Sequence, residues 1–365
     1  MAELRPFPEG INQPAQETDG VNSQSVQKLD FDPARRGFLK KTLSLTMGAL
    51  ILGLGLEKAV NLLSSKSKKS LLGKTTDVPD KSSTEENDFS ETSHLLEDKE
   101  ALECSWRELL ALKKELESFN LTQEFKEGSA EEGEFKKLVA QNLEDLKKRY
   151  HRSAFWYDRL FQQVGKHLPT ILEECRKAGV PPAVAIGVAL EESLVNQEAR
   201  SPSGRAIGVM QLEKPTALAW QKRREARDLI EEEDEEEIKM SKDLRTVAEH
   251  NIGVGIVGLR ELADRFGDWG VAVLAYNNGA TSVGRRVRNF REKGFLQKFG
   301  RVNYVRLLPL IPDYALKKKG GKTEAVSNAV HKYYPVRVEA KLRLFLEYYL
   351  PKLIGIVQKQ LESLS

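Results

Sequence analysis

The most restrictive feature of the sequence is an apolar run from Pro181 to Leu190, PPAVAIGVAL. Its two prolines favour a first helical turn, and a helix that is apolar on every face has to be buried. Glu192 follows at the far end, where the partial negative charge of the helix terminus and apolar surroundings both oppose ionisation. The run therefore predicts a carboxyl group that stays protonated near neutral pH and can act as a general acid. The alternative is that Glu191 and Glu192 are solvated residues closing a core helix.

Three motifs follow one another along the chain. The members of the first are Glu192, Ser193, Ala199, Ser201, Gly204, Ala206, Gly208, Met210, Gln211, Thr216 and Ala217. The second starts at Asn251 and ends in the run FGDWGVAVLAYNNG at Gly279, and the third is YPVRVEA from Tyr334. In order and approximate spacing they resemble the motifs of the lytic transglycosylases. The resemblance covers the chain from about His151 to Leu346.

This resemblance implies a mainly α fold with a goose-type lysozyme-like catalytic domain, and helical periodicity from Phe155 onward favours the same class. It implies non-hydrolytic cleavage of the β-1,4 bond between N-acetylmuramic acid and N-acetylglucosamine in peptidoglycan, which leaves a 1,6-anhydro sugar. Glu192 would protonate the leaving oxygen while the acetamido group of the substrate attacks the anomeric carbon. A standard glycosidase needs a second carboxylate, and neither Glu191 nor Glu198 is a convincing one.

The resemblance also suggests residues that bind substrate around the acid. They are Ser193, Ser201, Met210, Gln211, Tyr276, Asn277 and Tyr334. The two serines would hydrogen-bond around the carboxyl group, and the methionine and glutamine would line sugar subsites. Tyr276 and Asn277 would face Glu192 across the cleft, although the sequence AsnAsnGly is equally suited to a helix C-cap.

The chain departs from the family pattern in two places near the site. The loop after Glu192 is one residue longer, at Arg205, and this insertion is expected to displace it. The third motif exchanges proline and valine and has Glu339 where the family has leucine. Two other functions therefore stay open: a goose-type lysozyme-like hydrolase, in which water is the acceptor, and a non-catalytic peptidoglycan-binding envelope protein that keeps the fold.

The N-terminal part predicts export. Arg35 to Lys40, RRGFLK, precedes a moderately apolar run from Thr42 to Leu56, as in a twin-arginine signal. We expect residues 1–63 to be a signal or a membrane anchor, 64–100 a flexible spacer, 101–150 a helical region and 151–365 the catalytic domain. The expected location is the periplasm or cell envelope, with contact to the cytoplasmic membrane if the signal is not cleaved.

Composition limits the other functions. The chain has 57 basic and 54 acidic residues, a net charge of +3, so no strong field favours nucleic acid. The five histidines form no metal-binding motif, and no cofactor is predicted. Cys104 and Cys175 are expected to be two separate thiols. Peptidoglycan strands are the predicted partner, and the sequence indicates no particular protein partner.

Overall fold

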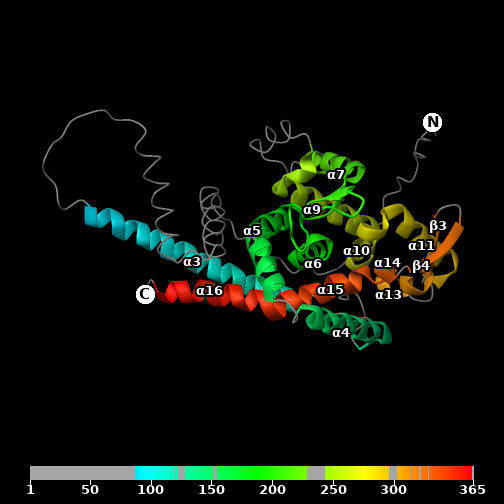
Figure 1. Ribbon diagram of the computed structural model, residues 1–365, viewed down its shortest axis with the longest axis horizontal. Helices are drawn as coiled ribbons and strands as arrows, with labels where there is room; N and C mark the ends of the chain where they lie inside the picture. Colours follow the sequence, from blue (N-terminus) through cyan, green and yellow to red (C-terminus); the bar gives the residue numbers. More distant parts are fainter. Residues whose placement is uncertain are drawn as a thin grey trace, which may run out of the picture.

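The computed structural model describes residues 87–119, 121, 128–150, 154–227, 243–295, 302–312, 314–319, 322–327 and 329–363. The predicted export segment, 1–63, lies outside these residues. Helices dominate the described part of the chain (Figure 1), which confirms the mainly α class. No helix in this part combines the length and apolar character needed to cross a membrane.

Helix α6 (Pro182–Ser193) lies at the centre of the fold. Every residue from Ala183 to Leu190 is buried, as its all-round apolar pattern predicts. Helix α15 (Tyr334–Leu344) crosses it at Gly187, where an added Cβ would lie 2.8 Å from Val338 Cγ1. Glycine therefore permits a close helix crossing, which brings residues of α15 beside the C-terminal turn of α6.

The helices around α6 share one core. Helix α9 packs against α5, α7 and α10, and α11 follows α10. Their bounds are α5 Ala154–Ala178, α7 Lys214–Ala226, α9 Ala248–Phe266, α10 Trp269–Asn278 and α11 Ala280–Glu292. A buried ion pair joins α7 to α5. Arg224 Nη2 lies 3.1 Å from Oε1 and 3.0 Å from Oε2 of Glu174.

The helical region expected at 101–150 packs on the predicted catalytic domain. Helix α3 (Asn87–Ser118) runs beside α16 (Leu350–Ser363), and α4 (Ala130–Tyr150) runs beside α15 (Figure 1). Because α3 begins at Asn87, residues 87–100 of the predicted spacer are helical, which corrects that boundary. Their polar composition suits a solvated helix as well as a coil, so composition alone does not distinguish the two.

Strands contribute little, but more than the sequence pattern predicts. Strands β3 (Tyr314–Lys319) and β4 (Lys322–Ser327) form an antiparallel hairpin that the helical periodicity does not predict. Strands β1 (Ala206–Ile207) and β2 (Leu212–Glu213) form a shorter hairpin after α6. Short helices α13 (Tyr304–Leu307) and α14 (Ala329–Lys332) and the 3₁₀ turns η1 (Leu244–Thr246) and η2 (Leu308–Leu310) connect the larger elements, and a π-helical turn, η3 (Phe345–Tyr349), joins α15 to α16.

The two cysteines are not joined to each other. Cys104 lies on α3 and is partly buried, whereas Cys175 is buried on α5. Burial raises the pKa of the Cys175 thiol well above its ordinary value, so this group stays protonated. The expectation of two separate thiols agrees with this arrangement.

Candidate active site

Glu192 lies in the last turn of α6, where its side chain is partly buried. The hydroxyl of Tyr334 donates a hydrogen bond to its Oε1 at 2.5 Å. The pKa of Glu192 is raised from 4.5 to about 7, mainly by burial and further by the charge of Glu191. The Tyr334 hydrogen bond and the charges of Lys341 and Arg337 oppose this rise. Near neutral pH the Glu192 carboxyl group is therefore protonated in about half of the molecules. The apolar run of α6 predicts a pKa shift in this direction.

Tyr334, the first residue of α15, is buried. The sequence suggests that it binds substrate, and this role stays a prediction; in the structure its hydroxyl points at the acid. Burial and the charge of Glu192 raise the pKa of Tyr334 well above its ordinary value, so the phenol keeps its proton. It can therefore donate to Glu192 in either protonation state of that carboxyl group.

Asn251 on α9 holds the loop that follows Glu192. Its buried side-chain amide accepts from the backbone N–H of Met210 at 2.7 Å and donates to the carbonyls of Ile207 at 2.9 Å and Arg245 at 3.2 Å. Gly208 approaches so closely that an added Cβ would lie 2.4 Å from Asn251 Nδ2. The second motif contains this asparagine, but its bonding to the loop could not be inferred from the sequence.

The predicted serines organise the same loop and not the carboxyl group. The Ser193 hydroxyl donates to the carbonyl of Val209 at 2.7 Å, and the Ser201 hydroxyl accepts from the backbone N–H of Ala206 at 3.0 Å. The single proton of Ser193 is used in this bond, so the predicted bond to Glu192 is corrected. The extra residue at Arg205 is taken up in the turn that Ser201 closes, between Ser201 and strand β1.

The structure contradicts the predicted role of Met210, whereas the predicted role of Gln211 stays a prediction. The Met210 side chain is fully buried and packs over Gly255 of α9, so it cannot line a sugar subsite. Gln211 is partly buried, and its side-chain amide donates to the carbonyls of Ala199 and Gly208, both at 3.0 Å. Both residues therefore fix the loop, and binding of sugar by the Gln211 amide would require these bonds to open.

Tyr276 and Asn277 close helix α10 near the acid. The Tyr276 hydroxyl donates to the carbonyl of Met210 at 2.8 Å, not to Glu192. Its pKa is nevertheless raised, first by burial and then by the charge of Glu192, which indicates that the two groups are near each other. Asn277 Oδ1 lies 2.7 Å from Nδ1 of the exposed His331, a contact that no sequence motif indicated. Gly279 ends the helix with φ +79° and ψ +135°, a positive-φ conformation that is not the left-handed helical one expected of the predicted C-cap.

Backbone strain gathers in the same segment. Leu194 (φ +56°), Val195 (φ +60°) and Gln211 (φ +46°) are the only non-glycine residues with positive φ in the described ranges. All three lie between the end of α6 and strand β2. Such conformations are costly for residues with a Cβ, most of all for a β-branched valine, and they cluster at functional sites. The segment after Glu192 therefore has the character of a functional loop.

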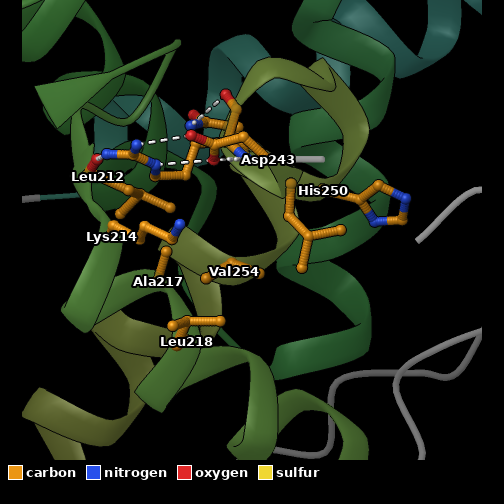
Figure 2. A pocket seen from close by; sticks show the side chains of 10 residues that line it. Leu212, Lys214, Ala217, Leu218, Asp243, His250 and Val254 are labelled. Carbon is orange, nitrogen blue, oxygen red and sulfur yellow. Dashed lines mark hydrogen bonds and ion pairs between the residues drawn. The ribbon is translucent and has the colours of Figure 1, made fainter. Parts of the chain in front are cut away.

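A pocket of about 180 Å³ lies between α7 and α9 (Figure 2). Leu218, Val254 and Lys214 are among its lining residues, and Glu192 is not. Asp243 and Arg245 form an ion pair at its edge, with Asp243 Oδ2 2.6 Å from Arg245 Nη2. Within the described residues, no group of three or more His, Cys, Asp or Glu side chains could hold a metal ion.

The segment that contains Glu192 is similar to a known family. The model of the Transglycosylase SLT domain matches residues 169–299. These residues are therefore similar to a transglycosylase SLT domain. The segment contains Glu192 and Tyr276, whereas Tyr334 lies beyond its end. The match confirms the resemblance to lytic transglycosylases and the lysozyme-like fold class. The stretch before Glu192 also resembles that of the membrane-bound, D-type murein transglycosylases. The match does not distinguish this branch of the family from others, so the branch stays a prediction.

Among solved structures, the chain is similar to an inactive mutant of the lytic transglycosylase Slt from Pseudomonas aeruginosa. The two share 18% identity with a TM-score of 0.30, and the match covers 62% of this chain and 30% of that one. The chain thus matches less than a third of the length of that protein. No curated protein matches the chain.

Proposed function

We propose that the SLT domain cleaves the β-1,4 bond between N-acetylmuramic acid and N-acetylglucosamine in peptidoglycan without water, leaving a 1,6-anhydro end. The observation that carries the proposal is Glu192, a carboxyl group whose pKa is raised to about 7 and whose Oε1 accepts from Tyr334. A general acid works best when its pKa lies near the working pH. The family match over residues 169–299 supports peptidoglycan as the substrate class.

The carboxylates around Glu192 favour a mechanism with one acid. Glu191 is the other carboxylate that acts on Glu192, and both of its oxygens are taken up by cations, Oε1 by Arg337 at 2.8 Å and Oε2 by Lys341 at 3.0 Å. A carboxylate held in this way is a poor nucleophile or base for the substrate. The acetamido group of the substrate then takes the role of the missing second carboxylate, as in other substrate-assisted glycosidases.

The reaction would balance without any co-reactant. Protonated Glu192 gives its proton to the glycosidic oxygen as the bond to the anomeric carbon breaks, and the acetamido oxygen forms a bond to that carbon. The Glu192 carboxylate then accepts the proton of the C6 hydroxyl, whose oxygen displaces the acetamido group. Glu192 ends in its starting form, so one residue serves as acid and then as base.

Digestion of purified peptidoglycan by the full chain in oxygen-18 water tests this proposal. We expect muropeptides that have anhydro ends and contain no oxygen-18. Labelled reducing ends would assign the chain to the lysozyme-like hydrolases instead. Intact sacculi that retain bound protein would favour the non-catalytic binding protein.

We also propose that the protein is exported and acts in the cell envelope. Arg35 and Arg36 and the apolar run after them support export, and they lie outside the described residues. Replacing both arginines by lysine keeps the charge and should leave the protein inside the cell, as measured by fractionation. The control Arg5→Lys should not change its location. Equal export of the double variant would refute a twin-arginine signal.

A further inference from the structure

Glu191, the residue before the acid, is far from solvated. Its side chain is only 9% exposed and lies between two cations of α15, with Arg337 Nη2 at 2.8 Å and Lys341 Nζ at 3.0 Å. Arg337 and Lys341 are themselves mostly buried, at 28% and 16% side-chain exposure. Ion pairs with this degree of burial are screened less than surface pairs, so removal of one partner has a large effect.

The same two cations reach the groups that surround the acid. The guanidinium of Arg337 lies over the ring of Tyr334, 5.8 Å from its centroid, and the Tyr334 hydroxyl contacts Glu192. Lys341 Nζ donates to the carbonyl of Leu190 at 3.0 Å, in the last turn of α6. Glu191 thus connects through Arg337 and Tyr334 to the carboxyl group next to it in the sequence.

We propose that Glu191 is a positioning residue: by binding Arg337 and Lys341 it fixes α15, with Tyr334, against the end of α6 and neutralises the two cations that lie beside Glu192. The inference rests on the proposed function only for its effect on catalysis. Glu191 touches neither substrate nor leaving group in this scheme. Its effect is exerted through Glu192 and Tyr334.

The direction of each effect follows from the charges that face Glu192. These groups are Glu191 on its own helix, Tyr334, Arg337 and Lys341 on α15, and Tyr276 on α10. The negative charge of Glu191 raises the pKa of Glu192, and the positive charges of Lys341 and Arg337 lower it. Loss of Glu191 should therefore make Glu192 release its proton at lower pH, and loss of Lys341 should have the opposite effect.

The test is a carbon-13 NMR titration of the Glu192 carboxyl group in the full chain, with glutamate labelled at the carboxyl carbon and the signal assigned by its absence in Glu192→Gln. We expect a midpoint near 7 in the wild type. The midpoint should fall by roughly one pH unit in Glu191→Gln and rise by a similar amount in Lys341→Met. Two exposed changes on α16, Glu362→Gln and Lys359→Met, are the controls and should leave it in place.

Opposite shifts would distinguish an electrostatic role from general damage to the fold, which has no reason to move the midpoint in two directions. Unchanged midpoints, or shifts of the same sign in both variants, would overturn the proposal. If the shifts occur and peptidoglycan is not cleaved by any form, the proposed function fails while the role of Glu191 stands. If peptidoglycan is cleaved, the pH above which activity is lost should shift in each variant in the same direction as the titration midpoint.

Discussion

At the scale of single residues, the neighbours of Glu192 control whether its carboxyl group carries a proton. Its pKa is raised from 4.5 to about 7, mainly by burial, and this value already includes the opposing effects of Tyr334, Lys341 and Arg337. The acid form is populated below about pH 7 and is lost above it. Activity that depends on this form should decrease as the pH rises through this value.

The same pKa makes the stability of the fold depend on pH. Between about 4.5 and 7 the folded protein holds a proton that the unfolded chain has released, so the free energy of unfolding falls as the pH rises through this range. Glu192→Gln has no such proton. We therefore expect the free energy of unfolding of the variant, relative to that of the wild type, to rise by about 1–3 kcal/mol between about pH 4 and pH 8. Urea unfolding at each pH measures this difference. A difference that is independent of pH would contradict the raised pKa.

Tyr334→Phe removes one hydroxyl from the site. Because the Tyr334 hydrogen bond lowers the pKa of Glu192, its loss should move the upper pH limit of activity to higher pH. Loss of orientation should also reduce kcat by about ten- to hundred-fold. The control Tyr333→Phe changes the preceding residue, whose ring contacts Lys332, and should retain wild-type kinetics. A lowered kcat with no change in the pH limit would mean that the hydroxyl does not act on the carboxyl group.

At the scale of elements, the loop from Leu194 to Glu213 depends on its contact with α9. Its backbone is bound by Asn251, and Ser193, Ser201 and Gln211 add bonds within the loop. Several residues that resemble substrate-binding positions are therefore occupied in holding the loop. The loop therefore has a fixed backbone directly after Glu192, and its strained residues agree with a loop that belongs to the site.

Two glycines of this loop form a matched pair. Gly204 and Gly208 both have positive φ, at +68° and +85°, but only Gly208 has neighbours within 4 Å of an added Cβ. Gly204→Ala should lower the free energy of unfolding by about 1–2 kcal/mol, the cost of the left-handed conformation. Gly208→Ala should lower it by about 3 kcal/mol or more, because its Cβ also meets Asn251. Equal losses in urea titrations would show that the contact with Asn251 does not matter.

The sequence predicted local features of these elements better than their contacts. The apolar run of α6 was sufficient to predict a buried helix with an acid at its end. The contact between Glu192 and Tyr334 spans 142 residues and depends on the crossing at Gly187, which no local pattern encodes. No strand pattern predicts the hairpin of β3 and β4, because neither strand shows clear alternation, although Gly320 and Gly321 between them are a hairpin signal.

At the scale of the whole molecule, the helical region and the catalytic part form one packed unit. Glu339, which replaces the leucine of the third motif, is buried on α15 and pairs with Arg343 at 2.7 Å. Arg343 Nη2 donates to the carbonyl of Phe119 at 2.9 Å, just after α3. The departure from the family pattern therefore has a structural role, because it ties the end of α3 to the helix that carries Tyr334.

Glu339→Gln tests this connection. The change leaves Arg343 without its ion pair in a mostly buried setting, and we expect a loss of roughly 2 kcal/mol in the free energy of unfolding, less than for a fully buried pair because Arg343 is 29% exposed. The control Glu103→Gln breaks the exposed pair with Arg107 on α3 and should cost less than about 0.5 kcal/mol. Similar losses in both variants would mean that the buried pair does not stabilise the junction.

The most direct measurement of the central claim is the initial rate of anhydro-muropeptide formation from purified peptidoglycan between about pH 5 and pH 9, by mass spectrometry, for the wild type and Glu192→Gln. We predict that the wild-type rate falls as the pH rises through about 7 and that the variant forms no anhydro product at any pH. Anhydro product formed by Glu192→Gln at the wild-type rate would contradict the role of Glu192 as the acid.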